Sequence, residues 1–263
     1  MALLLEDRNA VVYGAGGSVG RAVALAFARE GARVFLAGRT RAALDAVAEE
    51  VSAGGGSVQT AEVDTLDQAA VDAHADAVVR DVGGIDVSFN AVSHGDVHGP
   101  PLLEMPYQDF ARPITVATRA LFLTARAGAR HMVKRGSGVI MAITASTSHQ
   151  TLPEVGGTAV AFDAIESQCR QWATELGPHG VRVLWLQTTG LPEALADVDL
   201  FPGYGTGAPM TKADFLEWTR GKTMLKRLTT LDELGNAAAF AASDRAGAMT
   251  ACAVNLTCGA VPG

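Results

Sequence analysis

The sequence has few cysteines, few aromatic side chains and no long stretch free of charge. Its 263 residues include three cysteines, and aromatic residues make up 6% of the chain. Three cysteines without a CxxC pair predict neither a disulfide framework nor a paired-cysteine metal site, and they favour a reducing compartment. Charged residues interrupt every apolar stretch before it reaches transmembrane length. We therefore expect a cytoplasmic protein with no membrane partner.

Basic residues are also scarce. The chain has 21 Lys and Arg against 28 Asp and Glu, a formal net charge of −7, and no Lys/Arg-rich run. An acidic chain of this kind lacks the basic patch that binds a phosphate backbone, which argues against a nucleic-acid partner. Hydrophobic residues make up 48% of the sequence, enough to bury a large core, so the composition excludes disorder.

Apolar runs of strand length alternate with amphipathic segments of helix length from one end of the chain to the other. The predicted strands are residues 9–13, 33–36, 57–63, 85–91, 138–144, 181–186 and 249–256. The predicted helices are residues 21–30, 42–51, 67–79, 114–135 and 160–176. Near-continuous apolar strands joined through helices predict a parallel sheet covered on both faces. We expect a single α/β domain over residues 1–263, a Rossmann-type doubly wound fold.

Later segments carry helix-start signals and one long excursion. Thr230 and Glu233 have the spacing of a capping box, and Thr211 is a predicted N-cap. Between the sixth strand and Thr230, residues 188–227 are rich in glycine and proline. Excursions of this length in α/β enzymes usually cover the ligand crevice, so we predict a substrate lid there.

A glycine-rich loop, Gly14-Ala15-Gly16-Gly17-Ser18-Val19-Gly20, joins the first strand to the first helix. Glycine lets the backbone turn sharply and approach a pyrophosphate, whose charge then lies at the helix N-terminus. After the second strand, Gly38 occupies the place where an acid commonly binds the ribose of NAD, and Arg39 follows. A guanidinium suits the 2′-phosphate of NADP, so the sequence favours NADP(H).

These motifs resemble the short-chain dehydrogenase/reductase family over nearly the whole chain. The glycine loop is similar to the family's first motif, with Ser18 in place of its middle glycine. Val63-Asp64, Phe89-Asn90-Ala91-Val92 and the passage 175–183 resemble further family motifs. The resemblance implies an oxidoreductase with a small-molecule substrate, assembled as a dimer or tetramer through the helices at 114–135 and 160–176. It assigns the following residues to the cofactor: Gly14, Gly16, Gly17, Ser18, Val19, Gly20, Arg39, Asp64, Asn90 and Ala91.

The family's catalytic residues are not retained in this sequence. The resemblance implies a tetrad of Asn, Ser, Tyr and Lys, whose positions here read Ala117, Ala145, Thr158 and Phe162. No Tyr-x-x-x-Lys pair occurs anywhere in the chain. Threonine is a far poorer acid than tyrosine, and phenylalanine removes the cation that would tune an acid beside it.

Three hypotheses follow from this loss. In the first, hydride transfer continues on a pre-activated imine or iminium, or on a carbonyl with a replacement proton donor: Ser146, His149 or Thr158, with Thr144 and Tyr204 as further candidates. In the second, the chain is a catalytically silent nucleotide binder that acts as a sensor or partner subunit. In the third, it is a non-redox lyase or isomerase.

His94 and His98 follow the fourth strand, where we expect contacts at the substrate rim and no metal.

Overall fold

A single parallel sheet of seven strands forms the centre of the molecule. The computed structural model describes residues 3–195 and 200–262. The strands are β1 (Asn9–Tyr13), β2 (Arg33–Gly38), β3 (Ser57–Glu62), β4 (Val87–Asn90), β5 (Gly138–Ala145), β6 (Val181–Thr188) and β7 (Ala253–Leu256). Their order is β3-β2-β1-β4-β5-β6-β7, and every neighbouring pair is parallel. The predicted doubly wound fold is confirmed.

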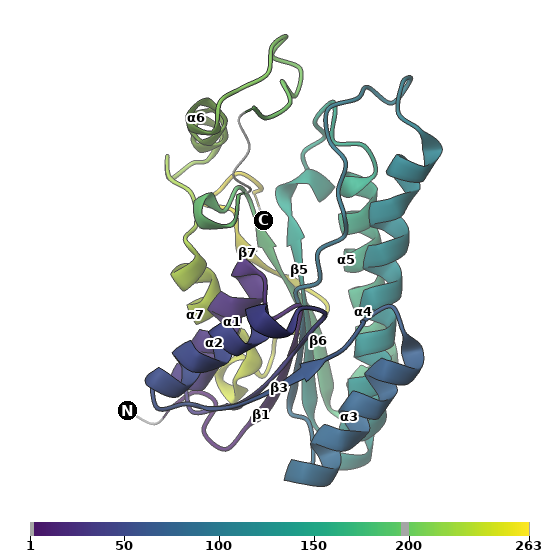
Figure 1. The fold of residues 1–263 in the computed structure, drawn as a ribbon, viewed down its shortest axis with the longest axis vertical. Coiled ribbons are helices and arrows are strands. Elements are labelled where there is room, and N and C mark those ends of the chain that lie inside the picture. Colours follow the sequence, from purple (N-terminus) through teal and green to yellow (C-terminus); the bar gives the residue numbers. More distant parts are fainter. Residues whose placement is uncertain (1–2, 196–199, 263) are drawn as a thin grey trace.

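Helices cover both faces of this sheet (Figure 1). The helices are α1 (Ser18–Arg29), α2 (Arg41–Ala53), α3 (Gln68–Val82), α4 (Tyr107–Arg135), α5 (Thr158–Leu176), α6 (Lys212–Lys222) and α7 (Leu231–Ala242). α1, α2 and α7 lie on one face, and α3, α4 and α5 lie on the other. Side chains of β1 alternate between the two cores, with Val11 in one and Val12 in the other, because successive strand residues point to opposite faces.

The two long helices begin earlier than the sequence predicts. α4 starts at Tyr107 and contains Pro113, whereas the predicted helix begins at residue 114. Pro113 lies beyond the first turn of α4, where proline removes one backbone hydrogen bond and must be tolerated by the surrounding packing. The beginning of α5 packs closely on this first part of α4, since a Cβ at Gly157 would lie 1.9 Å from the carbonyl oxygen of Phe110. Tertiary contact therefore supports turns that sequence periodicity does not indicate.

The last strand begins later in the chain than the sequence predicts. β7 begins at Ala253 and not at residue 249. Ala251 has a φ of 56°, in the left-handed region, although its N–H donates to the carbonyl of Val183. Such a backbone conformation does not continue a strand.

The excursion after β6 lies beyond the carboxyl end of the sheet, where Figure 1 shows α6. Thr211 caps α6 and Thr230 forms the predicted capping box of α7. Residues 196–199 of the predicted lid lie outside the described residues. Four described side chains form a small apolar cluster: Val155, Phe201, Tyr204 and Met210. No helix among the described residues combines the length and apolarity needed to cross a membrane.

Candidate active site

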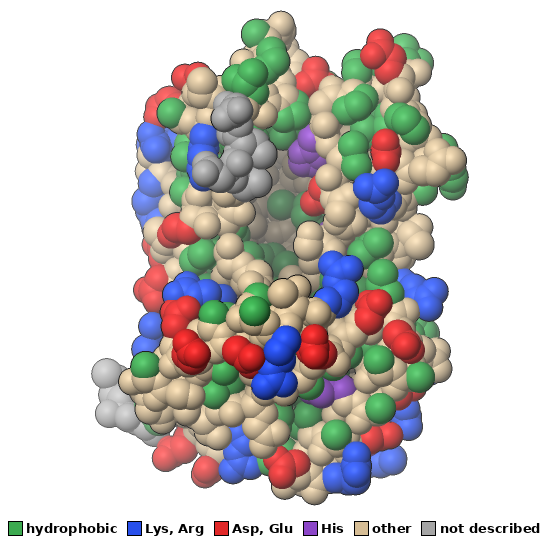
Figure 2. Space-filling model, viewed as in Figure 1, with side chains coloured by type: hydrophobic (Ala, Val, Ile, Leu, Met, Phe, Trp, Pro, Cys, Tyr) green, Lys and Arg blue, Asp and Glu red, His purple; other side chains and the backbone are tan. Residues whose placement is uncertain are grey.

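A cavity of about 450 Å³ opens at the carboxyl ends of β4, β5 and β6. In a doubly wound sheet, ligands bind at this edge, where the strand order reverses direction. Here the reversal falls between β1 and β4. Figure 2 shows a hollow in the upper half of one face, with hydrophobic side chains inside it and a histidine at its wall. We call this space the reaction cavity.

A second hollow of about 270 Å³ continues from the reaction cavity along the same edge. Four residues line both spaces: Gly17, Ala91, Val92 and Ser93. The second hollow extends over the ends of β1 and β2 as far as Gly38, Arg39 and Thr40. The two spaces form one elongated trough, and we call the part next to β2 its nucleotide end.

The glycine loop shapes the floor of this trough. Gly14 has a φ of 77°, and a Cβ there would lie 2.5 Å from the carbonyl oxygen of Ala91. A Cβ at Gly20 would lie 2.4 Å from the carbonyl oxygen of Gly14. α1 then begins at Ser18, with no side-chain cap and no acid in its first turn. Its free N–H groups suit an anion, and the loop therefore fits the pyrophosphate of a dinucleotide.

At the nucleotide end, Arg39 is exposed and lines the hollow. Arg41 is engaged elsewhere, since its Nε donates to both carboxylate oxygens of Asp45 at 2.9 Å. Thr40 is the N-cap of α2, but its hydroxyl makes no cap hydrogen bond. Arg39, the Thr40 hydroxyl and the start of α2 thus present donors to one place, which suits a phosphate group.

Two of the predicted cofactor residues act on the backbone of the loops. The carboxylate of Asp64 accepts from the N–H of Leu66 at 2.9 Å. Its neighbours Val63 and Thr65 line the nucleotide end of the trough. Asn90 is buried, donates to the Thr124 hydroxyl at 2.9 Å and accepts from the N–H of Val92 at 3.2 Å. Asn90 therefore holds the loop after β4, while Ala91 faces the trough.

The positions of the implied tetrad separate into two groups. Ala145, Thr158 and Phe162 line the reaction cavity, as does Thr144. Ala117 is buried in the core between the sheet and α4.

Ser146 and His149 are absent from the described residues that line the reaction cavity. The buried Ser146 hydroxyl donates to Thr189 at 2.9 Å. The exposed His149 contacts the buried carboxylate of Glu166, with 3.2 Å between Nε2 and Oε2. A short 3-10 helix at Ser146–Ser148 turns the chain at the end of β5 and directs these side chains elsewhere.

His98 completes the site, and sequence reasoning missed its role. Its Nε2 lies 3.0 Å from Oγ1 of Thr158, and its Nδ1 lies 3.0 Å from the Tyr204 hydroxyl. Its partners are 60 and 106 positions away in the chain, on α5 and on the excursion after β6. No local sequence signal connects the three residues. Together they place an imidazole against the hydroxyl that occupies the implied tyrosine position.

Burial sets the protonation of these groups. It lowers the pKa of His98 below its usual value, while the nearby Asp96 carboxylate acts in the opposite direction. Burial likewise lowers the pKa of His94. The His94 ring packs edge-on against Phe162, with 5.6 Å between the ring centroids. Burial, aided by Glu154, raises the pKa of Tyr204 to about 12. Tyr204 is therefore neutral, and His98 titrates on the acid side of its ordinary range.

Comparisons with known proteins agree with this architecture. A family model described as Enoyl-(Acyl carrier protein) reductase matches residues 14–260. A gluconate 5-dehydrogenase from Gluconobacter oxydans (strain 621H) is 30% identical over 239 residues, covering 91% of this chain and 89% of the relative. A solved short-chain type dehydrogenase/reductase from Mycobacterium marinum is 26% identical with a TM-score of 0.84, covering 100% of this chain and 98% of the other. The chain belongs to the short-chain dehydrogenase/reductase family.

A further solved structure shares the fold. It is a gluconate 5-dehydrogenase from Burkholderia cenocepacia J2315 in complex with NADP and tartrate, with a TM-score of 0.84 and 24% identity, covering 98% of this chain and 96% of the other. The named relatives are oxidoreductases. Their similarity extends over almost the full length of the chains compared.

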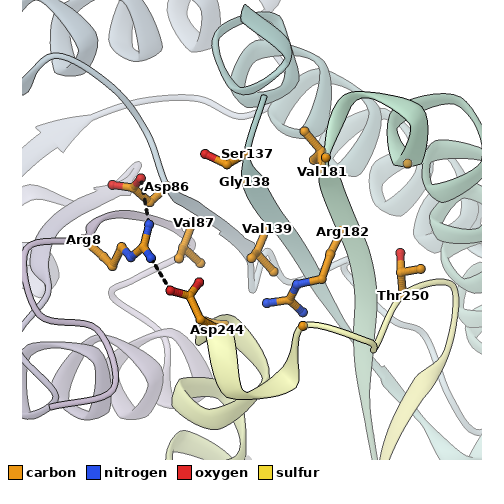
Figure 3. Close-up of a pocket in the computed structure, with 14 residues that line it drawn as sticks. Arg8, Asp86, Val87, Ser137, Gly138, Val139, Val181, Arg182, Asp244 and Thr250 are labelled. Carbon is orange, nitrogen blue, oxygen red and sulfur yellow. Dashed lines mark hydrogen bonds and ion pairs between the residues drawn. The ribbon is translucent and has the colours of Figure 1, made fainter. Parts of the chain in front are cut away.

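In this member of the short-chain dehydrogenase/reductase family, a further cavity of about 390 Å³ lies at the amino ends of the strands, away from the glycine loop (Figure 3). Its charged side chains are satisfied internally. Arg8 lies 2.6 Å from Asp244 and 3.7 Å from Asp86, and Arg182 donates to the carbonyls of Ala241 and Ser243. This network joins the sheet to the segment after α7, and we assign it a structural role.

Proposed function

We propose that this protein is an NADP(H)-dependent oxidoreductase that acts as a reductase, by hydride transfer to a small carbonyl or imine compound. The observation that carries the proposal is the continuous trough, in which Gly17 and Ala91–Ser93 line both the nucleotide end and the reaction cavity. A dinucleotide lying along it would reach from Arg39 to the cavity that holds Thr158. When bound, the reduced dinucleotide supplies the hydride.

The preference for NADP(H) is supported by the nucleotide end. Gly38 provides no carboxylate at the end of β2, and Arg39 and Thr40 leave their donors available to the hollow. A carboxylate there would bind ribose hydroxyls and repel a 2′-phosphate. The donors found there favour the phosphate.

The loss of the family tetrad is supported by what the reaction cavity contains. Thr158 and Phe162 stand where the resemblance places tyrosine and lysine. A carbonyl needs a proton on its oxygen as the hydride arrives. Thr158 and Thr144 are the predicted replacement donors that line the cavity. The Thr144 hydroxyl donates to the Glu166 carboxylate, whereas the Thr158 hydroxyl contacts the imidazole of His98. We therefore favour Thr158 over Ser146 and His149.

The walls of the reaction cavity favour a substrate without an acidic group. Among the described residues that line it there is no Lys or Arg, and the single acid is Asp96. Aromatic rings of Phe162 and Phe215 contribute to the walls. An anionic substrate would find no partner for its charge, whereas an iminium would be attracted by Asp96 and by the ring faces. This observation keeps a cyclic imine as the second candidate substrate.

The predicted substrate lid and homo-oligomer remain proposals with specific support. Leu191, Ala194, Leu195 and Phe215 of the excursion line the reaction cavity, as a lid would.

Phe122 on α4 and Val160 on α5 are 48% and 44% exposed, which supports assembly through these helices. Light scattering on the purified protein tests for a dimer or tetramer, and a monomer would contradict this assembly.

The proposed function is tested by calorimetric titration with NADPH and NADH, followed by an absorbance screen at the nicotinamide band. The screen uses ketones, aldehydes and cyclic imines. We expect tighter binding of NADPH and turnover on a neutral carbonyl or an imine. Binding without turnover on any class would favour the silent sensor or partner subunit. Conversion of a substrate without oxidation of NADPH would favour the lyase or isomerase, and no nucleotide binding would refute the proposal.

A further inference from the structure

We propose that His98 is the general acid of this enzyme and that the Thr158 hydroxyl relays its proton to the substrate, with Tyr204 and Glu154 as positioning residues. This inference rests on the proposed hydride transfer. It assigns the proton donor to a histidine on the loop after β4. In place of the single tyrosine that the family resemblance implies, His98 gives the proton and Thr158 passes it to the substrate.

The geometry places both ring nitrogens of His98 in defined roles. Nε2 points at Thr158, which is 3% exposed and lines the reaction cavity. Nδ1 meets the hydroxyl of Tyr204, whose side chain is buried. The rings of His98 and Tyr204 also pack edge to face, with 5.9 Å between their centroids. A ring held at both nitrogens keeps its orientation toward the cavity.

Glu154 connects the two segments that hold this histidine. Its backbone carbonyl accepts from the N–H of Gly99, the residue after His98, at 2.9 Å. Its carboxylate accepts from the N–H of Tyr204 at 2.8 Å. One residue of the loop before α5 thus fixes the distance between the loop after β4 and the excursion after β6.

The backbone at these positions is strained in a way that the contacts explain. Glu154 and Tyr204 have φ values of 66° and 47°, in the left-handed region that non-glycine residues rarely adopt. Such backbone conformations are unfavourable and persist where the surroundings hold them. Stacking of Tyr204 on Trp218, at 5.8 Å between centroids, helps to hold it. Strain of this kind concentrates at functional sites, which agrees with a catalytic role for the group it positions.

The reduced dinucleotide of the proposed function would supply the hydride and become oxidised, while the proton passes from His98 to the substrate through Thr158. As the carbonyl carbon accepts the hydride, the substrate oxygen takes the proton of the Thr158 hydroxyl, and the Thr158 oxygen takes the Nε2 proton of the His98 imidazolium. The carbonyl becomes an alcohol, His98 becomes neutral, and Tyr204 keeps its own proton. Solvent then reprotonates His98. An iminium substrate already carries its proton and needs no such transfer.

The charged and titratable groups around His98 determine the direction of the pH dependence. Asp96 and His94 lie on its own loop, Tyr204 on the excursion, and Glu154 before α5. Burial lowers the pKa of His98. The imidazolium therefore loses its proton at a lower pH than an ordinary histidine does. Carbonyl reduction should therefore slow as the pH rises through that pKa, and alcohol oxidation, which needs the neutral ring as base, should accelerate over the same interval.

The test compares His98→Asn with the matched surface variant His179→Asn in the full-length protein. We expect His98→Asn to lower kcat for carbonyl reduction by about 10²–10³-fold, within the range of general acid catalysis, and to abolish the pH dependence. Turnover of a preformed cyclic iminium should fall by less than about threefold, since no proton is transferred. Affinity for NADPH, measured by calorimetry, should be unchanged. Thr158→Val should reproduce the selective loss, and free imidazole should partly rescue His98→Ala.

Tyr204→Phe separates positioning from catalysis. It removes one hydrogen bond to Nδ1 and should shift the titration of the His98 ring protons, observed by NMR and assigned by their absence in His98→Asn. If His98→Asn retains carbonyl turnover and its pH profile, the assignment of His98 is wrong while the proposed function stands. If the wild-type protein binds NADPH but converts neither carbonyl nor imine, the proposed function fails first, and the role of His98 fails with it.

Discussion

Replacement of Arg39 by alanine tests the cofactor preference most directly. Arg39 lines the nucleotide end and is exposed, while Arg41 is held by Asp45. A hydrogen bond to a charged group contributes about 1.5–3 kcal/mol. Solvent screening at an exposed site favours the lower value, ~1.5 kcal/mol, which corresponds to about a tenfold change in Kd. Arg39→Ala should therefore weaken NADPH binding about tenfold.

The assay is calorimetric titration of the wild-type protein, Arg39→Ala and the matched control Arg41→Ala with NADPH and NADH. NADH lacks the 2′-phosphate, so its Kd should change little in either variant. Added salt screens exposed charges, and the difference between wild type and Arg39→Ala should shrink as salt rises. Unchanged NADPH affinity in Arg39→Ala would refute the reasoning. Equal losses for both nucleotides would point to a distorted loop and would also contradict a contact with the 2′-phosphate.

Three further predictions concern the scaffold of the site. Gly20→Ala places a Cβ 2.4 Å from the Gly14 carbonyl oxygen, so nucleotide affinity and Tm should both fall. Gly221→Ala meets no atom within 4 Å and lies in α6, so it should leave nucleotide affinity unchanged and should not lower Tm; equal behaviour of the two variants would contradict this. Thr230→Ala removes the capping box of α7 and should lower the free energy of unfolding by about 1 kcal/mol, measured by urea denaturation, with Thr230→Ser retaining most of it. Glu166→Ala removes the buried carboxylate that accepts from Thr144, Ser148 and Gln187 and should cost about 2–3 kcal/mol in the same experiment; an unchanged midpoint would contradict this.

Periodicity and glycine content were enough to predict the fold and the nucleotide end. Apolar strands such as β1 are buried on both faces, and a parallel sheet is the arrangement that satisfies them. The predicted caps at Thr211 and Thr230 are confirmed because they depend on residues three positions apart. The starts of α4 at Tyr107 and of α5 at Thr158 are harder to predict, since contact between these two helices stabilises them.

The catalytic shortlist shows where sequence reasoning reached its limit. Ser146 and His149 follow β5 closely in the chain, which makes them candidate donors by sequence, but a short 3-10 helix turns them toward Thr189 and Glu166. The family resemblance predicts Thr158, which lines the reaction cavity. Its partner His98 was expected only at the substrate rim.

The sequence by itself determined the order of strands and helices, the glycine loop and the charge at the end of β2, because each depends on residues adjacent in the chain. Only the tertiary structure brought His98, Thr158 and Tyr204 together, from positions 60 and 106 residues apart. Hydrogen bonds between loops depend on how the sheet aligns its strand ends and on how Glu154 joins two segments. Those distances are properties of the packed molecule, and no local pattern of residues encodes them.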